Sequence, residues 1–187
     1  EVEPTLVDLA GGNPTGPDFT FDCTSFADVL SGKTETHRQF AYGMNDNLPE
    51  GSAYPSRTVS DGHWRYIRNL TPDELYIQKY LMGSTGKNEL NNPYWGTWLF
   101  VASNHPKIYQ LVKRYMMRPP EELYDSIADP YEMTNLIADP KLADTKTKLS
   151  AELDRWMTAQ GDPGIPLDTH KALEAAQHGE HLYFPKP

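Results

Sequence analysis

Residues Tyr54–Leu70 read YPSRTVSDGHWRYIRNL, and this stretch decides the fold. Two runs rich in β-branched and aromatic residues flank the dipeptide Asp61-Gly62. Asp-Gly between two such runs is the strongest short-range signal for a tight β-hairpin. In the second run Trp64 and Tyr66 share one face and Ile67 lies on the other, so neither face is purely polar. The stretch therefore predicts a hairpin that is covered on both sides.

The segments around this hairpin extend the prediction to a small antiparallel sheet. Arg38–Met44 has aromatic residues at alternating positions, and Glu122–Ile127 is a short β-prone run, so each predicts a strand. Pro140–Gln160 carries apolar residues at helical spacing and ends at Gly161, which is typical of an amphipathic helix and its C-terminal stop. The predicted fold class is α+β: a small antiparallel β-sheet with a long C-terminal helix packed on it.

Other segments are expected to be shorter helices and loops. Helical spacing or capping residues predict four helices: Glu3–Ala10, Ser25–Leu30, Asp73–Leu81 and Asn104–Met117. The stretches 13–21 and 45–53 are rich in loop-forming residues, and His170–Gln177 predicts at most a turn. The aromatic cluster Tyr94, Trp95, Trp98 and Phe100 is interpreted as core or interface rather than as a sugar-stacking surface.

Composition and charge exclude two classes of function. The 187 residues include 17 basic and 26 acidic side chains, for a net charge of −9, which argues against a general nucleic-acid binder. No run approaches the ~20 apolar residues of a membrane span. Cys23 is the single cysteine, so an internal disulfide is impossible. The chain starts without Met or a signal peptide, which is expected for a piece cut from a longer protein or for a processed chain.

Five motifs in order resemble the C-terminal part of the type I sulfatases. Arg118–Asp125 (RPPEELYD) and Asp129–Leu136 (DPYEMTNL) look like the strand and capped turn that lead into the closing helix of that family. Pro4–Gly11 (PTLVDLAG) resembles the helix that ends the family's catalytic α/β part, and Phe26–Gly32 resembles the segment after it. Tyr54–Leu70 resembles the hairpin of the heparan N-sulfatase branch (sulfamidase, N-sulfoglucosamine sulfohydrolase).

The resemblance covers residues 2–163 and implies a division of the chain. Residues 1–35 would be the end of the catalytic α/β part and a connecting loop, 36–163 the sulfatase C-terminal subdomain of the alkaline-phosphatase-like fold, and 164–187 a tail. In the capped turn, Asp129 is expected to accept hydrogen bonds from the first turn while Glu132 reaches back toward it.

The resemblance implies a hydrolase that removes a sulfate ester or an N-sulfate from a glycan sugar. Such enzymes use a formylglycine made in a C/S-x-P/A-x-R motif and a calcium ion held by Asp and Asn. Cys23 stands in CTSFA, which lacks the Pro or Ala and the Arg. We therefore expect no catalytic and no metal-binding residue in this chain, and no cofactor. The nucleophile and the calcium would lie in an N-terminal catalytic domain, and the chain alone would be inactive. A periplasmic, secreted or lysosomal location is implied by the family.

Three residues are candidates for substrate binding. Arg57 is expected near the pocket mouth, where a guanidinium suits a sulfate or carboxylate; the alternative is an arginine that ties the hairpin to a carboxylate such as Asp125. Asn45 and Asp46 are candidates for sugar hydroxyls, with ordinary turn chemistry as the alternative, because this loop lacks the histidines of the sulfamidase branch.

Two further interpretations stay open. The chain could instead be a stand-alone carbohydrate-binding or protein-interaction module, which the aromatic cluster and the acidic composition favour. His178 and His181 could form at most a weak adventitious metal site, because no histidine in the chain has the spacing of a metal-binding motif.

Overall fold

A computed structural model describes residues 1–16, 19–21, 23–48, 52–83, 92–167 and 169–178. The chain divides into two compact units, Glu1–Gln39 and Phe40–Pro187. None of the helices in the described segments combines the length and the apolar character that crossing a bilayer requires.

The first unit contains two helices and a small strand pair. Helix α1 (Val2–Leu9) has Pro4 in its first turn and is followed by Gly11 at φ +76°, as its sequence predicts. Helix α2 (Ala27–Leu30) is held to α1 because the Phe26 amide donates to Thr5 Oγ1 at 3.0 Å. Strands β1 (Thr15–Gly16) and β2 (Phe19–Thr20) pair antiparallel within the stretch that was expected to be loop.

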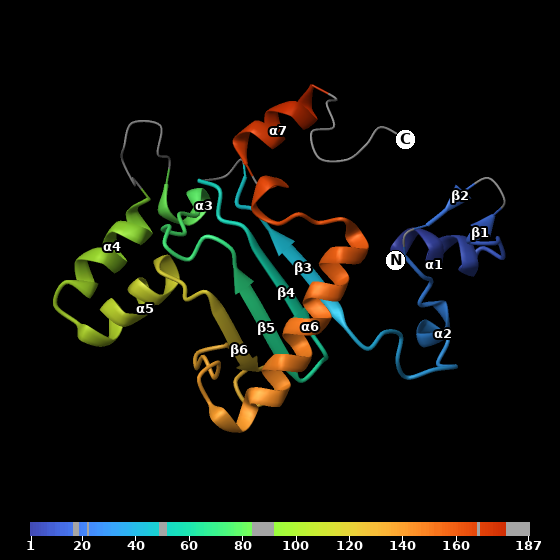
Figure 1. The fold of residues 1–187 in the computed structure, drawn as a ribbon, viewed down its shortest axis with the longest axis horizontal. Coiled ribbons are helices and arrows are strands. Elements are labelled where there is room, and N and C mark those ends of the chain that lie inside the picture. The colour runs from blue at the N-terminus through green and yellow to red at the C-terminus, as the bar shows by residue number, and fades with distance from the viewer. Residues whose placement is uncertain (17–18, 22, 49–51, 84–91, 168, 179–187) are drawn as a thin grey trace. The chain divides into compact units, whose positions relative to one another are not determined.

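The second unit is built on a four-stranded antiparallel sheet, shown in Figure 1. The strands β3 (Ala41–Asn45), β4 (Ser56–Ser60), β5 (Trp64–Asn69) and β6 (Glu121–Asp125) lie in this order across it. The Asp61-Gly62 turn joins β4 to β5: Asp61 Oδ1 accepts from the Trp64 amide at 2.8 Å, and Gly62 adopts φ +89°. The predicted hairpin and the predicted α+β fold class are confirmed.

A long helix covers one face of this sheet. After a 3₁₀ turn, η1 (Pro140–Leu142), helix α6 (Ala143–Gln160) crosses the strands (Figure 1) and ends at Gly161 with φ +66°. Leu149 and Leu153 on α6 and the sheet residues Val59, Tyr66 and Leu123 are fully buried and form the main core. Each buried leucine contributes about 1.5–3 kcal/mol, so this layer is the main source of stability in the unit.

A second, smaller core lies among three helices between β5 and β6: α3 (Lys79–Met82), α4 (Pro93–Ala102) and α5 (Pro106–Met116). Its buried residues are Met82, Trp95, Ala102 and Val112. The helix predicted over Asp73–Leu81 is wrong, since only α3 forms. The Tyr76 amide donates to the Met116 carbonyl at 2.8 Å, so this backbone is engaged with the end of α5 rather than with a helical turn.

The aromatic run in α4 is only partly core. Trp95 is fully buried, but Tyr94, Trp98 and Phe100 are 76%, 53% and 75% exposed. The interpretation of this run as core is therefore correct for Trp95 alone. Because apolar residues surround α4 on all sides, packing one side against α5 leaves the others uncovered.

The chain continues past α6 through η2 (Ile165–Leu167) into helix α7 (His170–Gln177). Thr169 caps α7, since its hydroxyl accepts from the Ala172 amide at 3.1 Å. A helix therefore stands where the sequence predicted at most a turn.

Candidate functional site

Arg57 lies on β4 with its side chain fully buried between the sheet and the end of α6. Its Nε donates to Asp162 Oδ2 at 2.5 Å and its Nη2 to Asp162 Oδ1 at 3.1 Å, while Nη1 donates to the Ser56 carbonyl at 3.0 Å. The carboxylate that ties down this arginine is thus Asp162 and not Asp125, which instead pairs with His63 at 3.3 Å. A substrate contact by Arg57 stays a prediction.

The ion pair governs the ionisation of Asp162. Burial alone would raise the pKa of this carboxyl, but the hydrogen bonds from Arg57 and from the Gly164 amide outweigh burial and hold the pKa below its ordinary value. Asp162 is therefore ionised in the folded protein at neutral pH.

Asn45 and Asp46 lie at the end of β3, away from Arg57. The register pairs Asn45 with Ser56 and Met44 with Arg57, so Asn45 and Arg57 are on opposite faces of the sheet. Asp46 performs turn chemistry, because its Oδ1 accepts from the Leu48 amide at 3.0 Å. The structure does not bring the three predicted substrate-binding residues into one site, and their roles toward a sugar stay predictions.

The described segments hold no group of three or more His, Cys, Asp or Glu side chains arranged to bind a metal ion. His181 lies outside the described residues, and with it the predicted pair of His178 and His181.

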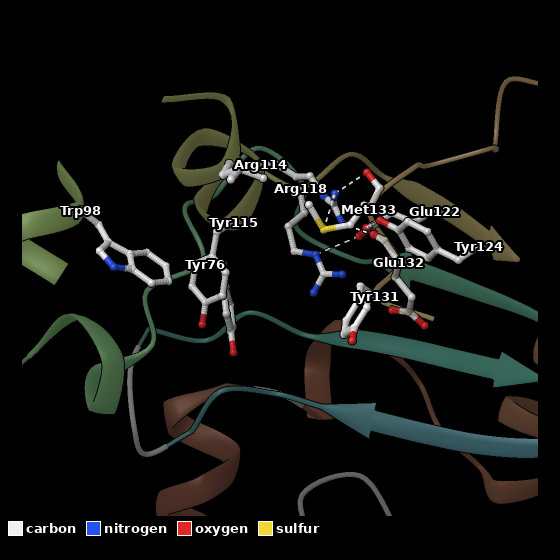
Figure 2. A pocket seen from close by; sticks show the side chains of 11 residues that line it. Tyr76, Trp98, Arg114, Tyr115, Arg118, Glu122, Tyr124, Tyr131, Glu132 and Met133 are labelled. Atoms are coloured by element: carbon white, nitrogen blue, oxygen red, sulfur yellow. Dashed lines mark hydrogen bonds and ion pairs between the residues drawn. The ribbon is translucent and has the colours of Figure 1, made fainter. Parts of the chain in front are cut away.

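The face of the sheet opposite α6 carries a pocket of about 420 Å³, shown from close by in Figure 2. Its walls come from β6, from the segment before α3, from α4 and α5, and from the turn after β6. The lining residues are Tyr76, Trp98, Leu111, Arg114, Tyr115, Arg118, Glu122, Tyr124, Tyr131, Glu132 and Met133. A second cavity of about 360 Å³ over β3 and β4 shares Tyr76, Arg118 and Glu132 with it.

Glu122 anchors the floor of the pocket through three hydrogen bonds. Its carboxylate accepts from Asn69 Nδ2 at 2.7 Å, from Arg118 Nε at 2.9 Å and from the Tyr124 hydroxyl. Burial opposes the charge, but these donors outweigh burial and lower the pKa of Glu122. Burial and the hydrogen bond to Glu122 both raise the pKa of Tyr124. Glu122 is thus an ionised, fully engaged carboxylate.

Glu132 lies in the wall of the pocket, and its backbone adopts the left-handed conformation with φ +52°. Its Oε1 accepts from Arg65 Nη1 at 3.0 Å, and Arg114 donates to the carbonyls of Glu132 and Met133. The predicted capping role of Glu132 is wrong, because its side chain reaches β5 instead. A strained non-glycine residue held by two arginines is typical of a position that the surrounding structure fixes strongly.

Sequence reasoning missed this pocket. The motif containing Arg118 and Glu122 was interpreted only as a strand signal, and the turn with Tyr131 and Glu132 only as a helix cap. The alternation along β6, which sends Glu122 and Tyr124 to the face opposite Leu123, was the signal that could have located it.

Comparisons with known proteins identify relatives of this chain. No family model matches. An ulvan-active sulfatase of Formosa agariphila is 34% identical over 179 residues, which is 91% of this chain and 32% of that protein. Human N-sulphoglucosamine sulphohydrolase is 29% identical over 126 residues, or 66% of this chain and 24% of that protein. The chain thus spans about a third, or less, of the length of these curated relatives.

Solved structures share the fold. A 2-O GAG sulfatase superposes with a TM-score of 0.53 at 21% identity, covering 87% of this chain and 25% of that one. A structure determined with its substrate D-glucosamine-2-N,6-O-disulfate gives a TM-score of 0.51 at 18% identity, covering 86% and 24%. The sheet with its closing helix is therefore a fold that also occurs as a part of much longer proteins.

Sequence similarity over most of the chain relates it to sulfatases. This similarity confirms the prediction that the chain resembles the C-terminal part of a sulfatase.

Proposed function

We propose that this chain is the C-terminal portion of a sulfatase that hydrolyses a sulfate ester or an N-sulfate on a glycan sugar. The observation that carries the proposal is the 34% identity to an ulvan-active sulfatase over 91% of the chain. The human sulphohydrolase among the relatives supports an N-sulfate substrate, and the similarity to a 2-O GAG sulfatase supports an O-sulfate.

The chain contributes the rim of the active site rather than its chemistry. Sulfate becomes a usable electrophile only when cations neutralise its oxygens. The proposal assigns a formylglycine nucleophile and a calcium ion to an N-terminal catalytic domain of the same protein, since the described residues of this chain hold no metal-binding group of His, Cys, Asp or Glu. Exposed apolar side chains support docking against such a domain. Tyr94, Phe100 and Tyr80 are each more than 70% exposed in the helices beside the sheet.

The proposal is tested by comparing two proteins: the longer protein that carries this sequence, and the 187-residue chain alone. Turnover is measured with a chromogenic aryl sulfate, N-sulfoglucosamine and glucosamine 6-sulfate. We expect turnover by the longer protein, abolished by calcium chelation, and only background rates with the 187-residue chain. Turnover by the short chain alone, or inactivity of the longer protein toward every sulfated compound, contradicts the proposal.

The alternative is a stand-alone carbohydrate-binding or protein-interaction module. The observation that favours it is the exposure of Tyr94, Trp98 and Phe100 on α4, since exposed aromatic rings can stack on sugars. Calorimetry with neutral and sulfated oligosaccharides separates the two functions. Binding that is lost in Phe100→Ala, in a protein without any catalytic partner, supports the module.

A further inference from the structure

We propose that the pocket around Arg118 binds one sugar unit through an anionic substituent, either a sulfo group or a carboxylate. The inference rests on the proposed function, and it assigns to this chain a subsite on the face of the sheet opposite Arg57. Three features carry it: an arginine with donors directed into the pocket, aromatic walls, and a local excess of positive charge.

Arg118 is placed to bind an anion with two donors. Its Nε is fixed on Glu122 Oε1 at 2.9 Å, whereas Nη1 and Nη2 donate to no other residue within the described segments. Figure 2 shows the guanidinium directed into the pocket among the tyrosine rings. The side chain is 29% exposed, so an incoming ligand can reach it. A guanidinium held on one edge is pre-organised to bind a sulfo group or carboxylate with the other.

The walls suit a sugar ring. Tyr131 is 84% exposed and Trp98 is 53% exposed, and both line the pocket. The rings of Tyr76 and Tyr115 contact each other at a centroid distance of 5.6 Å and extend the aromatic wall. Such rings offer an apolar face beside a polar edge. The volume of about 420 Å³ lies within the usual range of small-ligand pockets, which is roughly 300–1,000 Å³.

The charge of the site opposes that of the whole chain. Arg65, Arg114 and Arg118 surround the pocket and its neighbour, against the two carboxylates of Glu122 and Glu132. One positive charge is left over at this place, although the chain carries −9. A local cationic excess in a concave surface concentrates anions even on an acidic protein. Glu132 lines both cavities, and its Oε1 accepts from Arg65 Nη1 at 3.0 Å.

The test uses calorimetry on the 187-residue chain with four probes: N-sulfoglucosamine, glucuronate, neutral N-acetylglucosamine and inorganic sulfate. We expect N-sulfoglucosamine, glucuronate or both to bind at least about ten-fold more tightly than N-acetylglucosamine. The charged sugar that binds more tightly shows whether the pocket prefers a sulfo group or a carboxylate. Arg118→Gln is expected to weaken this binding by about ten- to hundred-fold, as for the loss of charged hydrogen bonds, and to leave the neutral sugar unchanged. Arg155→Gln, an arginine of α6 outside the pocket, is the matched control and should bind like the parent.

A second variant keeps the test decisive if Arg118→Gln fails to fold, which circular dichroism would show. Tyr131→Ala removes an exposed ring and is expected to weaken charged and neutral sugars alike by about ten-fold, whereas Tyr94→Ala on α4 should have no effect. Equal binding of charged and neutral sugars overturns the proposal. So does binding of inorganic sulfate as tight as that of the sugars, or binding unaffected by both pocket variants. Turnover of an aryl sulfate by the longer protein does not require this pocket, so the two proposals can fail separately.

Discussion

Replacing Arg57 with methionine would leave the Asp162 carboxylate buried without its guanidinium partner. The variant loses both bonds from Arg57 to Asp162 and the bond from Nη1 to the Ser56 carbonyl. Both side chains are almost inaccessible, at 0% and 5% exposure, so water cannot replace the lost partner. Removing one member of a buried ion pair costs about 3–5 kcal/mol. We expect a loss of that size from the free energy of unfolding at pH 7.

The pH dependence of this loss has a defined sign. In the parent protein the pKa of Asp162 lies below its ordinary value of 3.8, so the stability from the pair is fully present above that pH and is lost as pH falls below it. Without Arg57, burial is expected to raise the pKa of Asp162 above the ordinary value. The variant then regains stability as pH falls through the raised pKa. The stability gap between the two proteins should therefore narrow in acid.

The assay is urea unfolding followed by tryptophan fluorescence at pH 7 and pH 4. Arg155→Met is the control: the Arg155 side chain is 63% exposed in the pair with Glu152, so the change in stability should be less than about 1 kcal/mol. Adding Asp162→Asn to Arg57→Met removes the buried charge and should recover part of the loss. A loss below about 1 kcal/mol in Arg57→Met, or a stability gap that widens in acid, refutes the structural role of the Arg57–Asp162 pair.

Three more substitutions test other parts of the structure by the same unfolding measurement. Leu153→Ala, in the fully buried stripe of α6, should cost about 2–5 kcal/mol, whereas exposed Ala151→Ser should cost less than 1. Gly161→Ala forces a Cβ into φ +66° and should cost about 1–2 kcal/mol; an unchanged midpoint would argue against this helix end. Glu122→Gln leaves Arg118 without its carboxylate partner and should lower the free energy of unfolding by about 3 kcal/mol. This is the lower end of the range for a broken buried ion pair, because Arg118 is partly exposed. An unchanged stability would contradict the hydrogen-bond network around Glu122.

The hairpin and the closing helix could be predicted because their signals are local. The dipeptide Asp61-Gly62 favours a tight turn by itself, and Gly161 favours the end of a helix. Both features can therefore be predicted from a few neighbouring residues. The segment Asp73–Leu81 failed for the opposite reason. Its apolar spacing is helical, yet the Tyr76 amide bonds to Met116, a partner far along the chain that no local pattern reveals.

The candidate site was harder to predict because it is assembled from distant segments. Tyr76, Trp98, Arg118 and Tyr131 come from four stretches of the chain and meet only after the sheet has formed. Similarly, the sequence indicated a carboxylate partner for Arg57 but suggested Asp125, whereas Asp162 lies 105 residues away from Arg57. The sequence thus indicated that the partner of Arg57 is a carboxylate, but it did not identify which aspartate fills that role.

The bond between Arg57 and Asp162 also bears on how the second unit folds. Docking of α6 covers the Arg57 guanidinium, and the same step brings up its counter-ion, because Asp162 lies just beyond the last turn of α6. A sheet that has lost the helix would expose both the buried leucine layer and the ion pair to water. Sheet and helix should therefore form and come apart as one cooperative block spanning residues 56–162, without a stable intermediate that has lost only the helix.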